Sequence, residues 1–239
     1  MYGKKVWIGT PLVDERVLPH NATVFGEVAK RMTYFVDNVM SAFGGLSTFK
    51  ARVNGIYMNS EYIFGTFTSI STHPQVAMFQ TLSNYVAQFG LKMMWSPMWS
   101  TTSLENAAKV IRQTSIFDYA LIQPGYYFDG ASYNEKNCEV VRQDIATQQL
   151  WYVSPNTPIL PSSAITSWKT IIGCQMEIDD KCLDSAYMAR YNQYVSVFNT
   201  PITNYTKANA NFGFYFGAPT ASNSAGYNKA KSMVNQFFG

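Results

Sequence analysis

Short apolar runs alternate along the chain with longer stretches in which apolar residues recur every three or four positions. The six runs are VWIGTPL from Val6, NGIYMNSE from Asn54, LKMMWSPMW from Leu91, FDYALIQPGYYF from Phe117, TIIGCQMEID from Thr170 and FGFYFGAP from Phe212. Runs that are apolar at nearly every position are typical of strands buried on both faces, as in a parallel sheet covered by helices. The pattern therefore predicts an α/β fold built from β/α units.

The stretches between the runs have the spacing of amphipathic helices. Helices are expected over residues 24–43, 74–90, 104–115, 135–151, 183–198 and 225–238. Gly44 and Gly45 are placed to end the first of them, and Pro74 suits the first turn of the second.

Length favours a single α/β barrel over residues 1–239, because a TIM-like (β/α) barrel commonly takes about 250 residues. Six β/α units are two fewer than the usual eight. The sequence leaves three arrangements open: a closed or nearly closed six-stranded barrel, an open sheet, or a barrel whose first two units lie outside this chain.

The amino-acid composition bears on the cellular location of the protein and on the classes of partner that it binds. Charged residues make up 14% of the chain, against about 25% in a typical domain, which favours an extracellular or cell-surface location. The net charge is +3 and the longest basic run is Lys4-Lys5, so the footprint of a nucleic-acid-binding protein is missing. No apolar stretch approaches the roughly 18 residues that span a bilayer, and no membrane span is expected.

Two of the apolar runs reach a glutamate, at Glu61 and Glu177. In parallel α/β sheets the functional groups gather at the carboxyl ends of the strands, so both carboxylates are expected at one rim. Cleavage of a glycosidic bond needs such a pair, one acid to protonate the leaving oxygen and one carboxylate to attack or to activate water. The alternatives are that Glu61 is a solvated loop acid and that Glu177 complements the dipole of the helix after it.

Aromatic and polar residues near the strand ends suit a saccharide groove, because sugar rings pack on aromatic planes. The candidates for substrate binding are Tyr57, Trp95, Trp99, Gln123, Tyr126, Tyr127, Tyr215 and His20. Core packing is the competing interpretation for the aromatic residues, and a hydrogen bond inside the barrel is the one for Gln123. The three cysteines show no CxxC spacing, and P-loop and GxGxxG motifs are absent, so neither a metal nor another cofactor is expected.

The order of motifs resembles a known bacterial family. TPL, then Phe25-Gly26, GIYMNSE, GLKMMWSPMW, FDYALIQPGYYF and QMEID are similar to the family called domain of unknown function 4855. The resemblance implies an eight-stranded barrel of glycosidase type, in which the strands ending at Glu61 and Glu177 are the fourth and seventh. Retaining glycosidases of that kind carry the acid/base on strand four and the nucleophile on strand seven. The chain departs from the family at Gly125, where an asparagine is usual, and in lacking the first two units.

The leading hypothesis is a metal-independent glycoside hydrolase that cleaves an extracellular polysaccharide, with Glu61 as acid/base and Glu177 as nucleophile. A non-catalytic carbohydrate-binding barrel is the first alternative. A structural or assembly protein completed by a partner chain is the second, and the oligomeric state is left open.

Overall fold

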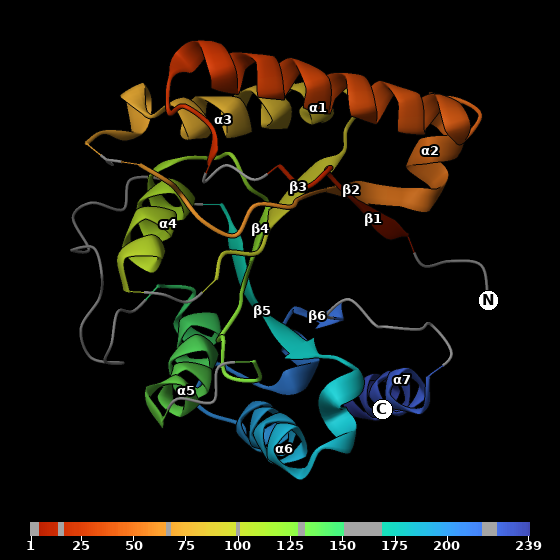
Figure 1. Ribbon diagram of the computed structural model, residues 1–239, viewed down its shortest axis with the longest axis vertical. Coiled ribbons are helices and arrows are strands. Elements are labelled where there is room, and N and C mark those ends of the chain that lie inside the picture. The colour runs from red at the N-terminus through yellow and green to blue at the C-terminus, as the bar shows by residue number, and fades with distance from the viewer. Residues whose placement is uncertain are drawn as a thin grey trace. The chain divides into compact units, whose positions relative to one another are not determined.

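The computed structural model describes residues 5–13, 17–65, 68–98, 101–128, 132–150, 169–216 and 224–239. Strands and helices alternate along these residues (Figure 1). The strands are β1 Val6–Gly9, β2 Val53–Met58, β3 Lys92–Trp95, β4 Tyr119–Ile122, β5 Ile171–Ile178 and β6 Phe212–Phe216. The helices are α1 Ala22–Ala42, α2 Leu46–Arg52, α3 Pro74–Ala87, α4 Thr101–Gln113, α5 Ser132–Thr147, α6 Ser185–Asn199 and α7 Ala225–Phe238.

The six strands form one sheet in chain order, β1-β2-β3-β4-β5-β6. Parallel registers join β1 to β2, β2 to β3, β3 to β4 and β5 to β6. Parallel neighbours need a crossover between them, and the helices supply it. The predicted α/β fold with a six-stranded parallel sheet is therefore confirmed. Closure into a complete barrel stays a prediction.

The helix boundaries follow local chemistry. Helix α1 begins after Asn21, whose side chain accepts a hydrogen bond from the Val24 amide at 3.0 Å. It ends before Gly44 and Gly45, whose φ angles of 84° and 98° lie in the left-handed region that glycine tolerates best. Helix α2, which follows directly, was not expected. Its seven residues are too few for a periodic apolar pattern to stand out.

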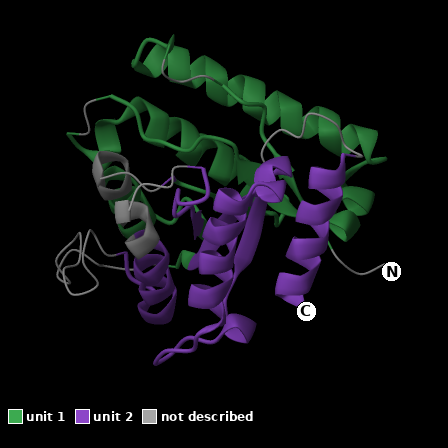
Figure 2. Ribbon diagram, turned by 60° about the horizontal axis from the view of Figure 1, so that its bottom comes forward, with its two compact units in different colours: residues 1–97, 102–120, 160–171 green, residues 98–101, 121–159, 172–239 purple. Residues whose placement is uncertain are grey.

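The chain divides into two compact units, coloured separately in Figure 2. Unit 1 comprises residues 1–97, 102–120 and 160–171, and unit 2 comprises residues 98–101, 121–159 and 172–239. Each unit is considered by itself below. The prediction of a single domain over residues 1–239 stays a prediction.

Unit 1 is organised around helix pairing and a cluster of rings. Helices α1 and α3 pack side by side (Figure 1). Beneath α3, the rings of Trp95 and Phe117 stack with centroids 5.0 Å apart, and Phe79 lies 5.6 Å from Trp95. Strands β2 and β3 approach closely at Gly55, where an added Cβ would stand 2.0 Å from the Lys92 carbonyl oxygen. The core of unit 1 is therefore aromatic and tightly packed.

In unit 2 the eight residues of β5 divide between the two faces of the sheet, because successive side chains of a strand point to opposite sides. Cys174 and Met176 belong to one face, and Gln175 and Glu177 to the other. The side chain of Leu121 packs against the face of the sheet that carries Glu177. An added Cβ at Gly173 would stand 2.5 Å from the Leu121 side chain, and one at Gly213 would stand 3.0 Å from it.

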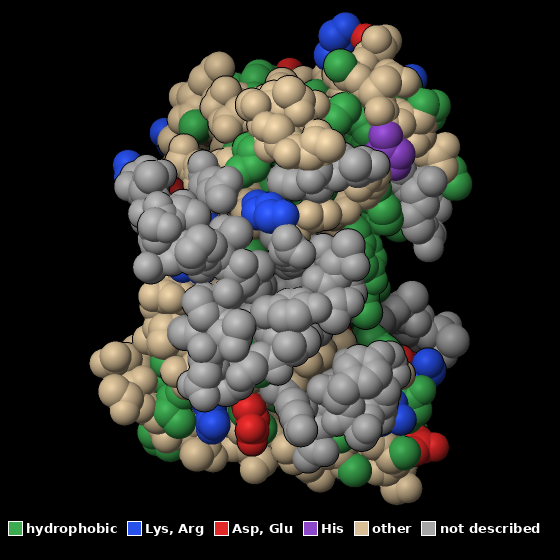
Figure 3. Space-filling model, turned by 90° about the vertical axis from the view of Figure 1, so that its left-hand side faces the viewer, with side chains coloured by type: hydrophobic (Ala, Val, Ile, Leu, Met, Phe, Trp, Pro, Cys, Tyr) green, Lys and Arg blue, Asp and Glu red, His purple; other side chains and the backbone are tan. Residues whose placement is uncertain are grey.

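None of the helices within the described residues is both long and apolar enough to cross a membrane. On the face drawn in Figure 3, the visible Lys and Arg side chains are scattered among acidic, polar and hydrophobic ones.

Candidate functional site

Glu61 lies in the loop that follows β2, in unit 1, and its side chain is half-buried. The loop is fixed just before Glu61, because the Trp95 indole N–H donates to the carbonyl oxygen of Ser60. Asn59 is held as well, since its amide donates to Thr10 Oγ1 at 3.0 Å. The strand was expected to reach Glu61, but β2 ends at Met58, and Glu61 lies in the loop beyond its carboxyl end. That the two glutamates share one rim stays a prediction.

Two side chains at the start of α3 hold the other part of this loop. Gln75 accepts a hydrogen bond from the Phe64 amide at 2.8 Å, and donates to the Tyr62 carbonyl at 2.8 Å and to Ser60 Oγ at 3.2 Å. His73 Nε2 lies 2.9 Å from the Phe64 carbonyl oxygen and therefore carries the proton in this contact. Burial lowers the pKa of His73, the bond to Phe64 opposes that effect, and the nearby His20 adds to the lowering.

Three of the predicted substrate-binding residues lie in unit 1. His20 is exposed and adjoins the Glu61 loop, with its ring centroid 6.3 Å from that of Phe64. Tyr57 is half-buried on β2. Trp95 is 0% exposed within the ring cluster, so it has no free face on which a sugar could stack, and its packing matches the alternative interpretation as a core residue.

Glu177 is the last residue but one of β5 in unit 2 and is 1% exposed. Its Oε1 accepts a hydrogen bond from the Gly125 amide at 3.1 Å, and its Oε2 accepts from the Tyr127 amide at 3.2 Å. The hydroxyl of Tyr194 donates to the same Oε2 at 2.5 Å. Each of these groups is a donor, which suits a charged carboxylate. The loop after β4 is therefore folded over Glu177 and bonded to it.

Tyr194, on α6, joins Glu177 to this loop. Its hydroxyl accepts hydrogen bonds from the amides of Tyr126 at 3.1 Å and Tyr127 at 3.0 Å, while donating to Glu177. The side chain is fully buried. Burial, and then the charge of Glu177, raise the pKa of Tyr194 well above its ordinary value. The phenol therefore keeps its proton and remains a hydrogen-bond donor to the carboxylate.

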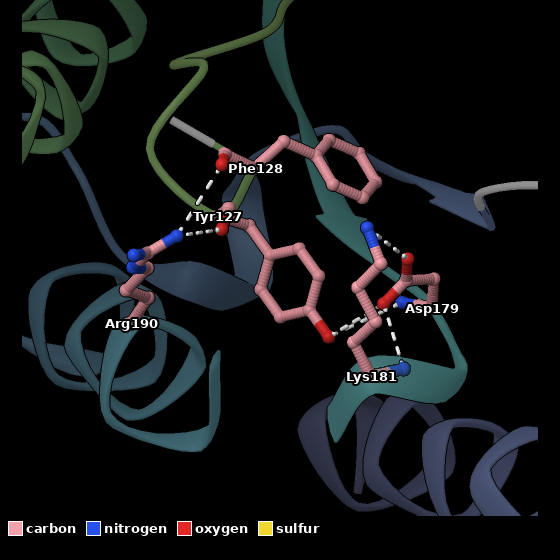
Figure 4. A network of polar contacts seen from close by, with 5 residues as sticks. All are labelled: Tyr127, Phe128, Asp179, Lys181 and Arg190. Atoms are coloured by element: carbon pink, nitrogen blue, oxygen red, sulfur yellow. Dashed lines mark hydrogen bonds and ion pairs between the residues drawn. The ribbon is translucent and has the colours of Figure 1, made fainter. Parts of the chain in front are cut away.

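A second set of contacts holds the same loop at Tyr127 and Phe128 (Figure 4). The Tyr127 hydroxyl donates to Asp179 Oδ1 at 2.9 Å, and Lys181 Nζ stands 4.0 Å from Asp179 Oδ2. Arg190, on α6, donates to the carbonyl oxygens of Tyr127 at 2.8 Å and Phe128 at 3.3 Å. Burial, followed by the bond to Asp179, raises the pKa of Tyr127. The loop is thus held by a negatively charged side chain, Asp179, which directly follows β5, and by a positively charged one, Arg190, on α6.

The remaining predicted substrate-binding residues in unit 2 differ in accessibility. Tyr127 and Gln123 are buried, so neither presents a free surface in this structure. Tyr126 is half-buried, and its ring packs edge-on against Tyr194 with centroids 6.1 Å apart. Tyr215 pairs in register with Glu177 and is 40% exposed. Trp99 lies outside the described residues.

Sequence reasoning missed three side chains that organise these loops: Gln75, Tyr194 and Arg190. A signal existed for Tyr194, because Tyr187, Tyr191, Tyr194 and Phe198 recur at helical spacing and mark one face of the helix. That spacing indicates burial, but it does not reveal which backbone groups the hydroxyl meets. Gln75 and Arg190 carry no comparable signal.

Across the described residues, no three His, Cys, Asp or Glu side chains gather in a way that would hold a metal ion. The arrangement offers instead two separate glutamates, Glu61 in a loop beyond β2 that side chains hold in place and Glu177 near the carboxyl end of β5. Carboxylates of this kind can donate a proton, accept one or attack an electrophilic carbon.

Comparison with known proteins gives one family and no closer relative. No curated protein and no solved structure matches the chain. A family model described as a domain of unknown function, DUF4855, matches residues 20–149, which is more than half of the chain. The match includes the Glu61 loop and ends before β5 and Glu177. The chain therefore belongs to the DUF4855 family.

Proposed function

We propose that this chain is a glycoside hydrolase-like barrel that cleaves an extracellular polysaccharide, with Glu61 as acid/base and Glu177 as nucleophile. The observation that supports this most is the setting of Glu177, which ends a parallel strand and faces two amide donors and a phenol. A nucleophilic carboxylate must be ionised, and these donors favour its charge. In the proposed barrel, two further β/α units complete the six described here.

The reaction would run in two steps. Glu177 attacks the anomeric carbon while the bond to the leaving oxygen breaks, and Glu61 gives that oxygen its proton. Water then attacks the glycosyl-enzyme ester as Glu61 takes a proton from it, which frees Glu177 and returns the sugar with its original anomeric configuration. Neither step requires a metal or a redox cofactor. The partly exposed Tyr215, in register with Glu177, is the proposed stacking surface for a sugar ring.

The test is turnover by Glu61→Gln and Glu177→Gln on a panel of soluble polysaccharides, measured as reducing ends released. Each variant is expected to lose about 10²-fold or more in kcat, because general acid/base catalysis typically contributes about 10²–10⁴. Glu139→Gln is the matched control, since Glu139 is exposed on α5. Full activity in both glutamine variants, on a substrate that the wild type cleaves, would overturn the assignment.

A non-catalytic carbohydrate-binding barrel is the second candidate, and the burial of Glu177 favours it. A carboxylate that is 1% exposed and bonded to the Gly125 and Tyr127 amides can serve to anchor the loop after β4 without ever meeting a substrate. In that case polysaccharides bind without being cleaved. Glu177→Gln would then lower the melting temperature, because its NH₂ group opposes donors, while leaving glycan binding by Glu61→Gln intact.

A further inference from the structure

We propose that Gln75 is a positioning residue for Glu61, which rests on the acid/base role proposed above. Gln75 lies in the first turn of α3 and is 0% exposed. Its carboxamide bonds to the loop on both sides of Glu61, at Ser60 Oγ before it and at the Tyr62 carbonyl and Phe64 amide after it. One planar group therefore spans the segment that carries the proposed acid.

The chemistry of the carboxamide explains why a glutamine stands there. The group offers an oxygen that accepts and a nitrogen that donates twice, and the loop uses both functions. Glutamate is acceptor-only when ionised, and asparagine is shorter by one methylene. Burying an amide is costly unless its hydrogen bonds are made. The contacts of Gln75 thus compensate its own burial while fixing the loop backbone.

Two other side chains bond to the backbone of Ser60 and Phe64, the ends of the segment that Gln75 holds. The Trp95 indole N–H donates to the Ser60 carbonyl, and His73 donates to the Phe64 carbonyl at 2.9 Å. Ile63, which lies between Ser60 and Phe64 in the chain, is buried. The backbone on either side of Glu61 is therefore held by side chains from α3 and β3. A displacement of about 1 Å in a catalytic group can cost about 10²-fold in rate.

The expected consequence is a selective loss of general-acid catalysis. A leaving group of high pKa needs a proton as its bond breaks, whereas a leaving group of low pKa departs as an anion without one. If Gln75 positions the acid, its loss will slow cleavage of poor leaving groups far more than of good ones. A change that only destabilises the fold lowers both rates in the same proportion.

The experiment compares Gln75→Glu with Gln80→Glu, a change of the same kind on the same helix at a half-buried glutamine that bonds to Asn84. The substrates are the phenyl and 2,4-dinitrophenyl glycosides of a sugar that the wild type cleaves. For Gln75→Glu, kcat/KM, which reports the first step alone because that step is irreversible, is expected to fall at least about tenfold on the phenyl glycoside and less than about twofold on the dinitrophenyl one. Gln80→Glu should match the wild type on both.

A second readout does not depend on activity. Gln75→Met removes the acceptor for the Phe64 amide, so hydrogen exchange at that amide should be at least about tenfold faster than in the wild type. If Gln75→Glu does not fold, Gln75→Met takes its place in the comparison of the two glycosides. Equal losses on both glycosides, or unchanged exchange at Phe64, overturn the positioning role. A wild-type protein that cleaves no glycoside overturns the proposed function and with it the catalytic purpose of Gln75, while the exchange result still decides whether the loop is clamped.

Discussion

Single buried or half-buried polar side chains in this protein hold backbone groups of loops. Gln75 bonds to the loop after β2, and Tyr194 and Arg190 bond to the loop after β4. Loops lack the regular ladder that satisfies backbone groups in helices and strands, so their buried amides and carbonyls need other partners. The consequence is that loop shape here depends on a few side chains, whose replacement should act locally.

The first residue-scale prediction concerns His73 and pH. Burial is the main cause of its lowered pKa, so the folded state favours the neutral ring more than the unfolded chain does, where the pKa is about 6.5. The resulting stability is present above that value and is lost as the pH falls below it toward the folded pKa. Denaturant titrations should show that the free energy of unfolding falls more between pH 7.5 and pH 5 in the wild type than in His73→Gln. Parallel pH dependence in the two proteins would contradict this.

A second residue-scale prediction contrasts two glycines of unit 1. Gly55→Ala places a methyl group against the Lys92 carbonyl and the Trp7 ring, and should lower the free energy of unfolding by about 1–3 kcal/mol. Gly26→Ala is the control, because Gly26 lies in α1 with nothing within 4 Å of an added Cβ. Alanine there should stabilise by about 0.5–1 kcal/mol. Chemical denaturation measures both, and a tolerated alanine at position 55 would mean that β2 and β3 can separate.

At the scale of elements, the apolar runs located all six strands but not where each one ends. The run from Phe117 to Phe128 is apolar at most positions, yet β4 stops at Ile122. Pro124 has no N–H for a ladder, and the amides of Gly125 and Tyr127 bond to Glu177. Hydropathy cannot register this change of partner, because the residues stay buried while their hydrogen bonds go elsewhere.

An element-scale prediction concerns the start of α6, the helix that carries Arg190 and Tyr194. Asp184 caps it, since its Oδ1 accepts a hydrogen bond from the Ala186 amide at 2.7 Å. Asp184→Ala should cost about 0.5–2 kcal/mol, measured by thermal or denaturant unfolding. Asp184→Asn should restore most of the loss, because asparagine caps about as well as aspartate. A loss of the same size in both variants would indicate that the charge of Asp184 matters more than its cap.

For the molecule as a whole, sequence could predict the strands near which the two glutamates lie but not what surrounds the two side chains. The strands follow from apolar patterning, and the β/α order follows from the alternation of runs. The partners of Glu177 are distant along the chain: Tyr194 is 17 residues away from it and Gly125 is 52. Such contacts depend on how α6 and the loop after β4 pack, which one sequence does not encode in any local pattern.

The family match covers only part of the molecule. It covers residues 20–149, which hold Glu61, Gln75 and the loop after β4, and stops short of Glu177. The family assignment therefore rests on the part of the chain that holds Glu61 and not on the part that holds Glu177.

Because residues 125–127 fold over Glu177, the reactivity of its carboxylate depends on whether these residues cover it. The amides and phenol that favour the charge also occupy the lone pairs with which the carboxylate would attack. Lifting the loop to admit another molecule would remove the two amide donors from the carboxylate. Attack by Glu177 on a substrate would therefore require residues 125–127 to move away from its carboxylate first.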